Sequence, residues 1–298
     1  MEKRKERARL WVQVCTAALT NGYVKGFAEG KIFTGPSKRI CVPGLNCYSC
    51  PGAFGSCPIG SLQAVLGSRN YRMSFYVIGF LMLTGALLGR FVCGWLCPFG
   101  LIQDLLYKIP VKGKRKNLPG HRGLVWLKYG ILAVFVLLLP LTVVDIIGQG
   151  SPWFCQYICP AGTLEAGIPL VAANEALKRA VGFLFIWKIL ILAAVVLLSV
   201  WIYRPFCKYL CPLGAVYSVF NPIALYRYQV DDKSCTGCRK CRKACGMDIR
   251  VWEMPNSPEC IRCGDCLKAC PEGAIHKIHI SGRKNGERNP DEKNEVKE

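Results

Sequence analysis

Long apolar segments dominate the hydrophobic pattern of the chain. Residues 74–92, 124–147 and 182–203 are each close to the roughly 20 residues that cross the hydrocarbon core of a bilayer. A fourth segment, residues 10–27, is interrupted by Gln13, Thr16, Thr20 and Asn21. We expect it to span as well, with an interfacial helix as the alternative. The pattern predicts a mainly α protein whose membrane domain, residues 10–222, is a four-helix transmembrane bundle.

Basic residues flank the expected spans and predict their orientation. The N-terminal tail, residues 1–9, holds Lys3, Arg4, Lys5, Arg7 and Arg9. The loop after the second span holds Lys108, Lys112, Lys114, Arg115, Lys116 and Arg122. By the positive-inside rule, these segments and both termini lie in the cytoplasm, and the chain is a multi-pass membrane protein. The first external loop departs from the rule, because it carries Lys31, Lys38, Arg39, Arg69 and Arg72.

The sequence Cys-Pro-x-Gly occurs four times, beginning at Cys57, Cys97, Cys159 and Cys211. With four spans, the copies alternate between the outer and the inner side of the membrane. Each half of the membrane domain then consists of a span, outer cysteines, a second span and inner cysteines. This order predicts a pseudo-twofold internal repeat.

The composition becomes more polar towards the C-terminus, where residues 228–280 hold eight cysteines. They form two runs of Cys-x2-Cys-x2-Cys-x3-Cys, the spacing that binds two [4Fe-4S] clusters in bacterial ferredoxins, with the fourth cysteine of each run crossing to the other cluster. One predicted cluster has the ligands Cys235, Cys238, Cys241 and Cys270; the other has Cys260, Cys263, Cys266 and Cys245. Zinc is disfavoured because zinc knuckles are usually separated by a longer gap. We therefore expect a small α+β ferredoxin module, followed by a disordered tail over residues 281–298.

Two cysteine pairs follow the second and fourth expected spans. Cys93 and Cys97 are four residues apart, so a continuous helix would place them on one face, and Cys207 and Cys211 repeat this spacing. The proline after each pair is expected to end or kink the helix, and the glycine permits a tight turn. If both pairs meet at the inner surface, they supply four thiolates for one further iron–sulfur cluster.

The outer side offers Cys155-x3-Cys159 together with Cys47-x2-Cys50-x6-Cys57. The predicted ligands of an outer iron–sulfur cluster are Cys50, Cys57, Cys155 and Cys159, with Cys47 as the competing ligand. Cys41 and Cys47 could instead form a disulfide if this side is oxidising. Packing residues or disulfides are the alternative for all the membrane pairs, but four repeats with the same Pro-x-Gly sequel argue against it. Cys15 is expected to be a small buried hydrophobe.

Missing motifs exclude several cofactors and partners. There is no Cys-x-x-Cys-His, which argues against c-type haem attachment. None of the three histidines lies in an expected span, which excludes a membrane haem held by two histidines. A nucleotide or flavin site is not evident either, since no Gly-x-Gly-x-x-Gly turn or Walker loop is present. The net charge of +20 does not predict nucleic-acid binding, because the basic residues flank membrane spans and ligand loops. We expect these basic residues to contact membrane lipid.

Residues 74–275 resemble the membrane polyferredoxins of the NapH/NosR type, on the basis of the two Cys-x3-Cys-Pro motifs and the two-cluster module. The resemblance implies a bacterial inner-membrane protein. Such a protein passes electrons between the quinone pool or cytoplasmic donors and periplasmic reductases, or supports the assembly of metal centres. The additional outer motifs depart from the simplest pattern of this family. The resemblance alone therefore does not predict that this chain oxidises quinol.

The predicted function is transmembrane electron transfer. A cytoplasmic donor, a ferredoxin or flavoprotein, would reduce the ferredoxin module, and the inner and outer clusters would carry electrons to an extracytoplasmic redox acceptor. The chain would be the electron-transfer component of an oxidoreductase system and would need no catalytic residue, although Asp145 and Glu165 are candidate proton carriers or interfacial anchors. The alternatives are a quinol dehydrogenase that feeds a periplasmic reductase and a metal-handling factor that assembles or reduces a copper centre.

Overall fold

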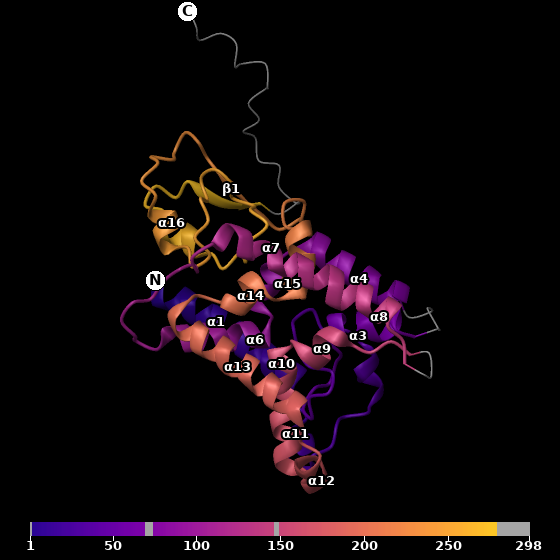
Figure 1. The fold of residues 1–298 in the computed structure, drawn as a ribbon. Coiled ribbons are helices and arrows are strands. Elements are labelled where there is room, and N and C mark those ends of the chain that lie inside the picture. Colours follow the sequence, from indigo (N-terminus) through magenta and orange to yellow (C-terminus); the bar gives the residue numbers. More distant parts are fainter. Residues whose placement is uncertain (1, 69–73, 146–148, 279–298) are drawn as a thin grey trace, which may run out of the picture.

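The computed structural model describes residues 2–68, 74–145 and 149–278. The chain folds into a mainly helical domain and a small ferredoxin module that contains the two strands of the described part (Figure 1). The predicted disordered tail, residues 281–298, lies outside the described residues. The first half of the helical domain contains α1 (Glu2–Thr20), α2 (Val24–Glu29), α3 (Pro58–Leu66), α4 (Ser74–Leu88), α5 (Phe91–Trp95) and α6 (Pro98–Lys108).

The second half of the helical domain has two long helical stretches, His121–Thr142 and Phe183–Trp201, with shorter helices between and after them. Its elements are α7 (His121–Ile131), the π-helix η3 (Leu132–Leu138), α8 (Leu139–Thr142), α9 (Trp153–Tyr157), α10 (Pro160–Gly162), the π-helix η4 (Thr163–Gly167), α11 (Ile168–Ala173), α12 (Glu175–Arg179), α13 (Phe183–Trp201), α14 (Pro205–Tyr209) and α15 (Pro212–Phe220). Figure 1 shows the ferredoxin module at one end of the molecule and α11 and α12 at the opposite end.

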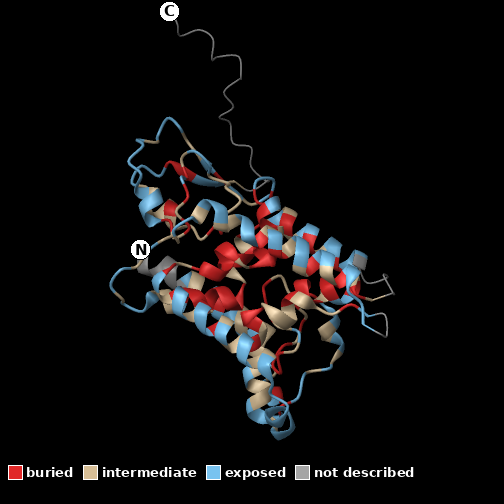
Figure 2. Cartoon of the chain, in the orientation of Figure 1, coloured by how far each residue is buried: buried red, intermediate tan, exposed pale blue. Residues whose placement is uncertain are grey.

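Two of the described helices are long and apolar enough to cross a membrane, His121–Thr142 and Phe183–Trp201. The apolar part of α4 is shorter, and α1 is too polar to meet the same criterion. The four-span bundle therefore stays a prediction. Large apolar side chains on α13 are exposed, among them Phe183 at 81% and Leu190 at 59%. The buried residues gather between the long helices, where the short cysteine-bearing helices meet (Figure 2).

Each Cys-Pro-x-Gly sequence starts a helix. The cysteine is the N-cap residue and the proline is the first helical residue in α3, α6, α10 and α15. Proline suits this position because it lacks the N–H that would have no partner there. The expectation that Cys93 and Cys97 share one helix is wrong. Helix α5 ends at Trp95, and Cys97 is extended, because a residue before proline is driven out of the helical conformation.

The ferredoxin module consists of β1 (Arg227–Val230), α16 (Lys240–Ala244), α17 (Asp265–Ala269) and β2 (Ile275–Ile278). The strands are antiparallel, with Arg227 opposite Ile278 and Val230 opposite Ile275. The module packs on the helical domain near the start of α1, since Arg9 forms an ion pair with Asp265 at 3.6 Å. The N-terminal helix and the module therefore lie at the same end of the molecule.

Candidate metal centres

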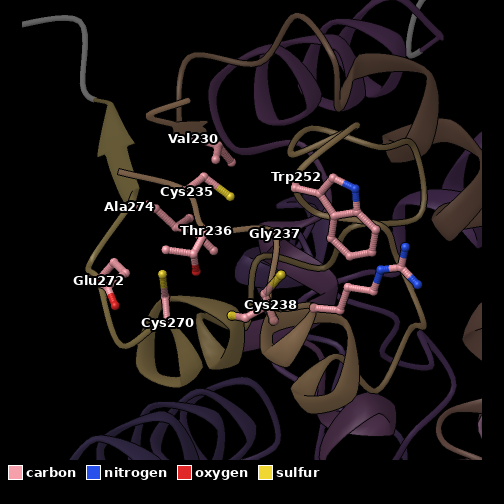
Figure 3. Close-up of a pocket in the computed structure, with 12 residues that line it drawn as sticks. Val230, Cys235, Thr236, Gly237, Cys238, Trp252, Cys270, Glu272 and Ala274 are labelled. Atoms are coloured by element: carbon pink, nitrogen blue, oxygen red, sulfur yellow. The ribbon is translucent and has the colours of Figure 1, made fainter. Parts of the chain in front are cut away.

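Four cysteines of the ferredoxin module line one pocket, and we call them the distal set: Cys235, Cys238, Cys241 and Cys270. Two of them belong to the loop that follows β1, Cys241 lies on α16, and Cys270 follows α17. Figure 3 shows Cys235, Cys238 and Cys270 around this pocket, with Trp252 beside it. The fold therefore brings together the four residues that the spacing assigned to one cluster.

The proximal set consists of Cys245, Cys260, Cys263 and Cys266. The Cys245 thiol lies close enough to the other three to interact with each of them electrostatically. Burial, with a smaller contribution from the neighbouring Cys245, raises the pKa of Cys260 to about 11. Thiols that are packed together in this way ionise readily only when a metal offsets their charge.

The inner set, Cys93, Cys97, Cys207 and Cys211, is wholly buried. Its two pairs come from α5–α6 and α14–α15, and the Cys211 thiol interacts with all three other thiols. The amide of Gly214 points at the Cys211 sulfur at 3.4 Å, and Gln103 Nε2 donates to the Cys207 sulfur at 3.1 Å. The structure thus assembles at one place the two pairs that the sequence predicted to meet.

Two arginines cross between the halves of the inner set. Arg90 precedes Cys93 by three residues, yet its Nη2 donates to the carbonyl of Cys207 at 3.0 Å. Arg204 precedes Cys207 by three residues, and its Nη1 donates to the carbonyl of Cys93. Both side chains are fully buried. From the sequence we expected Arg90 to be an interfacial anchor near the end of a span, which is wrong because the side chain is fully buried. We did not single out Arg204, although Arg-x-x-Cys-x3-Cys-Pro is present in both inner copies.

Carboxylates partner both crossed arginines. Arg90 Nη1 donates to Glu259 Oε2 at 2.6 Å, and Lys128 Nζ contacts the other oxygen of the same carboxylate. Arg204 Nε donates to Asp104 Oδ1 at 2.6 Å, and Arg9 also pairs with Asp104. Burial alone would raise the pKa of Asp104, but Arg204 and Arg9 hold it at about 2. Asp104 therefore stays ionised at neutral pH.

A cavity of about 320 Å³ in the outer half is lined by four cysteines, which we call the outer set: Cys47, Cys57, Cys155 and Cys159. A Cβ added at Gly162 would lie 3.6 Å from the Cys47 sulfur, and one added at Gly60 would lie 3.8 Å from the Cys155 sulfur. The structure therefore places Cys47 here in the position that we predicted for Cys50. Cys50 is buried but does not line the cavity.

The remaining cysteines lie away from these sets. Cys41 is buried in a bridge to Ser56, and neither Cys41 nor Cys47 is joined in a disulfide. Cys15 is exposed on α1, so the expectation of a buried hydrophobe is wrong. The helix turns this side chain away from Gln13, which is the buried residue on this part of α1.

The residue six positions after three of the four Cys-Pro cysteines hydrogen-bonds to a cysteine of one of these sets. In the outer half, Gln63 Nε2 donates to the Cys155 sulfur at 3.3 Å, as Gln103 does to Cys207 in the inner half. Glu165 occupies the same position after Cys159, and its Oε2 accepts from the Cys47 amide at 2.7 Å. Burial raises the pKa of Glu165 to about 7. The other predicted proton carrier, Asp145, is exposed.

Unpartnered polar atoms support a bound group in these sites. Asn46 lines the outer cavity, is fully buried, and both polar atoms of its side chain lack a partner within the described chain. In residues 2–68, 74–145 and 149–278, no three Cys, His, Asp or Glu side chains converge tightly enough for a single metal ion. A [4Fe-4S] cluster takes one thiolate at each of its four irons, and each set supplies four cysteines. The residues therefore fit [4Fe-4S] ligation.

The loops of neighbouring sets are in contact. Gly94, between two inner cysteines, lies against Ile261, between two proximal ones. Lys208, in the other inner pair, donates to the carbonyl of Gly246 at 3.1 Å. Between the inner and outer sets, Gly44 packs on the backbone of Leu96 and Cys97.

A family described as a 4Fe-4S binding domain matches residues 70–117, 130–168 and 183–224. A second family with the same description matches residues 256–276. The first three segments contain the Cys-Pro-x-Gly copies at Cys97, Cys159 and Cys211, and the last contains the second ferredoxin run. No solved structure matches the chain.

Several curated proteins are similar. The uncharacterized protein MJ0749 of Methanocaldococcus jannaschii is 31% identical over 193 residues, which is 63% of this chain and 63% of that protein. MJ0750 of the same organism is 32% identical over 195 residues, 63% of this chain and 72% of that protein. The ferredoxin-type protein NapH of Haemophilus influenzae is 29% identical over 223 residues, 70% of this chain and 69% of that protein. The chain thus spans less than two thirds of MJ0749.

Proposed function

The chain belongs to the membrane polyferredoxin family of the NapH/NosR type, and on this premise we propose that it conducts electrons across a membrane. The proposed path runs from a cytoplasmic donor through the distal, proximal, inner and outer sets to an extracytoplasmic acceptor. Iron–sulfur clusters bound at these sets would supply one-electron chemistry, with potentials set by charge, hydrogen bonds to sulfur and exposure. The side chains hold and tune them, and no general acid or base is needed.

The observation that carries this proposal is the unbroken series of contacts between the cysteine sets. Gly94 joins the inner set to Ile261 of the proximal loop, and Gly44 joins the inner set to the outer loop. The proximal and distal sets interlock because Cys245 and Cys270 each cross to the other run. Such a series would be unnecessary in a protein that only stores or inserts a metal.

The surface of the long helices supports a membrane location for the path. Leu190 and Leu197 on α13 are exposed at 59% and 57%, and Trp126 on α7 at 71%. Apolar surface of this extent is unfavourable in water and marks a contact with lipid or another protein. A bilayer around α7–α8 and α13 would place the ferredoxin module on one side and the outer set towards the other.

The first test is the iron and acid-labile sulfide content per chain after anaerobic purification, with EPR of the reduced protein. About sixteen iron atoms are expected, since each of four [4Fe-4S] clusters contributes four. Cys97→Ser should remove about four of them. Cys15→Ser is the matched control, because this thiol is exposed and belongs to no set. About eight iron atoms in the unmodified protein would confine the clusters to the ferredoxin module and favour the metal-handling alternative.

Electron transfer across a bilayer is then measured directly. The protein is reconstituted in sealed vesicles that contain ferricyanide, and dithionite-reduced ferredoxin is added outside. Reduction of the trapped ferricyanide is expected for the unmodified protein and for Cys15→Ser, and loss of it for Cys97→Ser and Cys159→Ser. Transfer that occurs only after a quinone is added would favour the quinol dehydrogenase alternative.

A further inference from the structure

The inner set is surrounded by an excess of buried positive charge. Arg90 and Lys128 share the single carboxylate of Glu259. Arg204 and Arg9 share the single carboxylate of Asp104. Arg9 also pairs with Asp265, which in turn pairs with Lys268. The first group therefore has two cations and one anion, the second has three cations and two anions, and each carries one net positive charge. Arg90, Lys128 and Arg204 are fully buried. Buried charges are screened far less than exposed ones, so this excess acts on whatever the inner thiolates hold.

Within residues 2–68, 74–145 and 149–278, no such group of buried cations lies at the outer set. The residue three positions before Cys155 is Pro152, where the inner copies have arginine. Among the described residues, Lys188 reaches this loop: its Nζ donates to the Cys155 carbonyl at 3.3 Å, and its side chain is only half-buried. Lys38 is also half-buried and donates to the carbonyl of Ala53, while the nearby Glu165 is an acid. The positive field at the outer set is therefore weaker and more screened.

We propose that Arg90 and Arg204 are positioning residues that raise the reduction potential of the inner cluster above that of the outer cluster. This inference rests on the proposed function, because it requires a cluster at each set. Reduction adds one negative charge to a cluster, and a nearby buried cation stabilises that charge. Each guanidinium lies against the backbone of the opposite cysteine pair, so both arginines act on the same cluster.

The expected size of the effect follows from Coulomb's law. Two unit charges about 10 Å apart, at an effective dielectric constant of about 20, change an equilibrium constant by roughly tenfold. For a one-electron couple, a tenfold change corresponds to about 59 mV. An electron shared between the two sets would therefore reside mainly on the inner one, and its release outward would depend on the acceptor.

The test is an EPR-monitored redox titration of the anaerobic, detergent-solubilised protein. The inner signal is the one that disappears in Cys97→Ser. Arg90→Gln should lower the midpoint potential of this signal by about 59 mV, a tenfold change in the reduced-to-oxidised ratio. Arg90→Lys keeps the charge, so the midpoint potential of the inner signal should stay close to that of the unmodified protein. Lys188→Gln is the matched control at the outer end and should leave the midpoint potential of the inner signal unchanged.

A second variant makes the test specific for charge. Glu259→Gln keeps both cations and removes their shared carboxylate, so the inner potential should rise. Shifts of opposite sign in Arg90→Gln and Glu259→Gln would not arise from a merely structural role. If the inner signal is present and neither variant moves it, the inference is wrong while the proposed function stands. If Cys97→Ser removes no signal and no iron, the proposed function itself fails.

Discussion

Gly94 and Ile261 are in direct backbone contact: a Cβ added to Gly94 would lie 2.2 Å from the carbonyl oxygen of Ile261. The first residue follows Cys93 of the inner set, and the second follows Cys260 of the proximal set. Trp95 strengthens this contact, because its Nε1 donates to the carbonyl of Arg262 at 3.0 Å. The ferredoxin module is thus docked through the loops that carry the thiols themselves.

Gly94→Ala should displace the ferredoxin module from the helical domain. The blocking atom is a backbone oxygen, which cannot swing aside, so overpacking is expected to cost about 1–3 kcal/mol. Transfer from the proximal to the inner set should slow, while the iron content stays unchanged because no thiol is removed. Freeze-quench EPR after rapid reduction measures this step.

Gly130→Ala is the control for that variant, because nothing lies within 4 Å of a Cβ added at this position of α7. Its transfer rate and its thermal midpoint should both stay close to those of the unmodified protein. Equal transfer rates for Gly94→Ala and Gly130→Ala would contradict the docking described above.

Cys47→Ser should remove the outer cluster, and Cys50→Ser should not. Cys47 lines the cavity together with Cys57, Cys155 and Cys159, whereas Cys50 does not line it. A serine oxygen is a poorer ligand for iron than a thiolate. The measurement is iron per chain, with a loss of about four atoms expected for Cys47→Ser alone. The reverse result would restore Cys50 as the ligand.

Asp104→Asn should destabilise the helical domain by about 3–5 kcal/mol, because it leaves Arg204 buried without its anionic partner. The pH dependence has a definite sign. The pKa of Asp104 is lowered from 3.8 to about 2, so its contribution to stability is complete above pH 3.8 and is lost as the pH falls through 2. The thermal midpoint of the unmodified protein, followed by circular dichroism, should fall in this window more steeply than that of the variant.

Local spacing in the sequence was enough to group most of the thiols as the structure places them. The two ferredoxin runs and the two inner pairs are each defined by short intervals, and a short interval limits where a thiol can lie. Helix periodicity misled us at Cys97, since it ignored the extended conformation that Pro98 imposes on the preceding residue.

Other features depend on contacts between distant segments and could not be predicted from spacing. The spacing led us to predict Cys50 with Cys47 as the competing ligand, whereas the fold places Cys47 and not Cys50 at the outer cavity. The crossing of Arg90 and Arg204 is likewise a tertiary feature. An arginine three residues before each inner cysteine pair is visible in the sequence, but the sequence does not show that each arginine contacts the opposite pair.

The glutamines at the sixth position after Cys57 and Cys97 should tune two separate clusters in the same direction. Gln103 Nε2 donates to the Cys207 sulfur at 3.1 Å, and Gln63 Nε2 donates to the Cys155 sulfur at 3.3 Å. Hydrogen bonds to cluster-ligating sulfur are one of the terms that set reduction potentials, and a donor favours the more negative, reduced state. Gln103→Leu should lower the inner potential and Gln63→Leu the outer one, each without loss of iron. Redox titration of the two variants side by side checks this, and a shift of the same signal in both would contradict the assignment of one glutamine to each half.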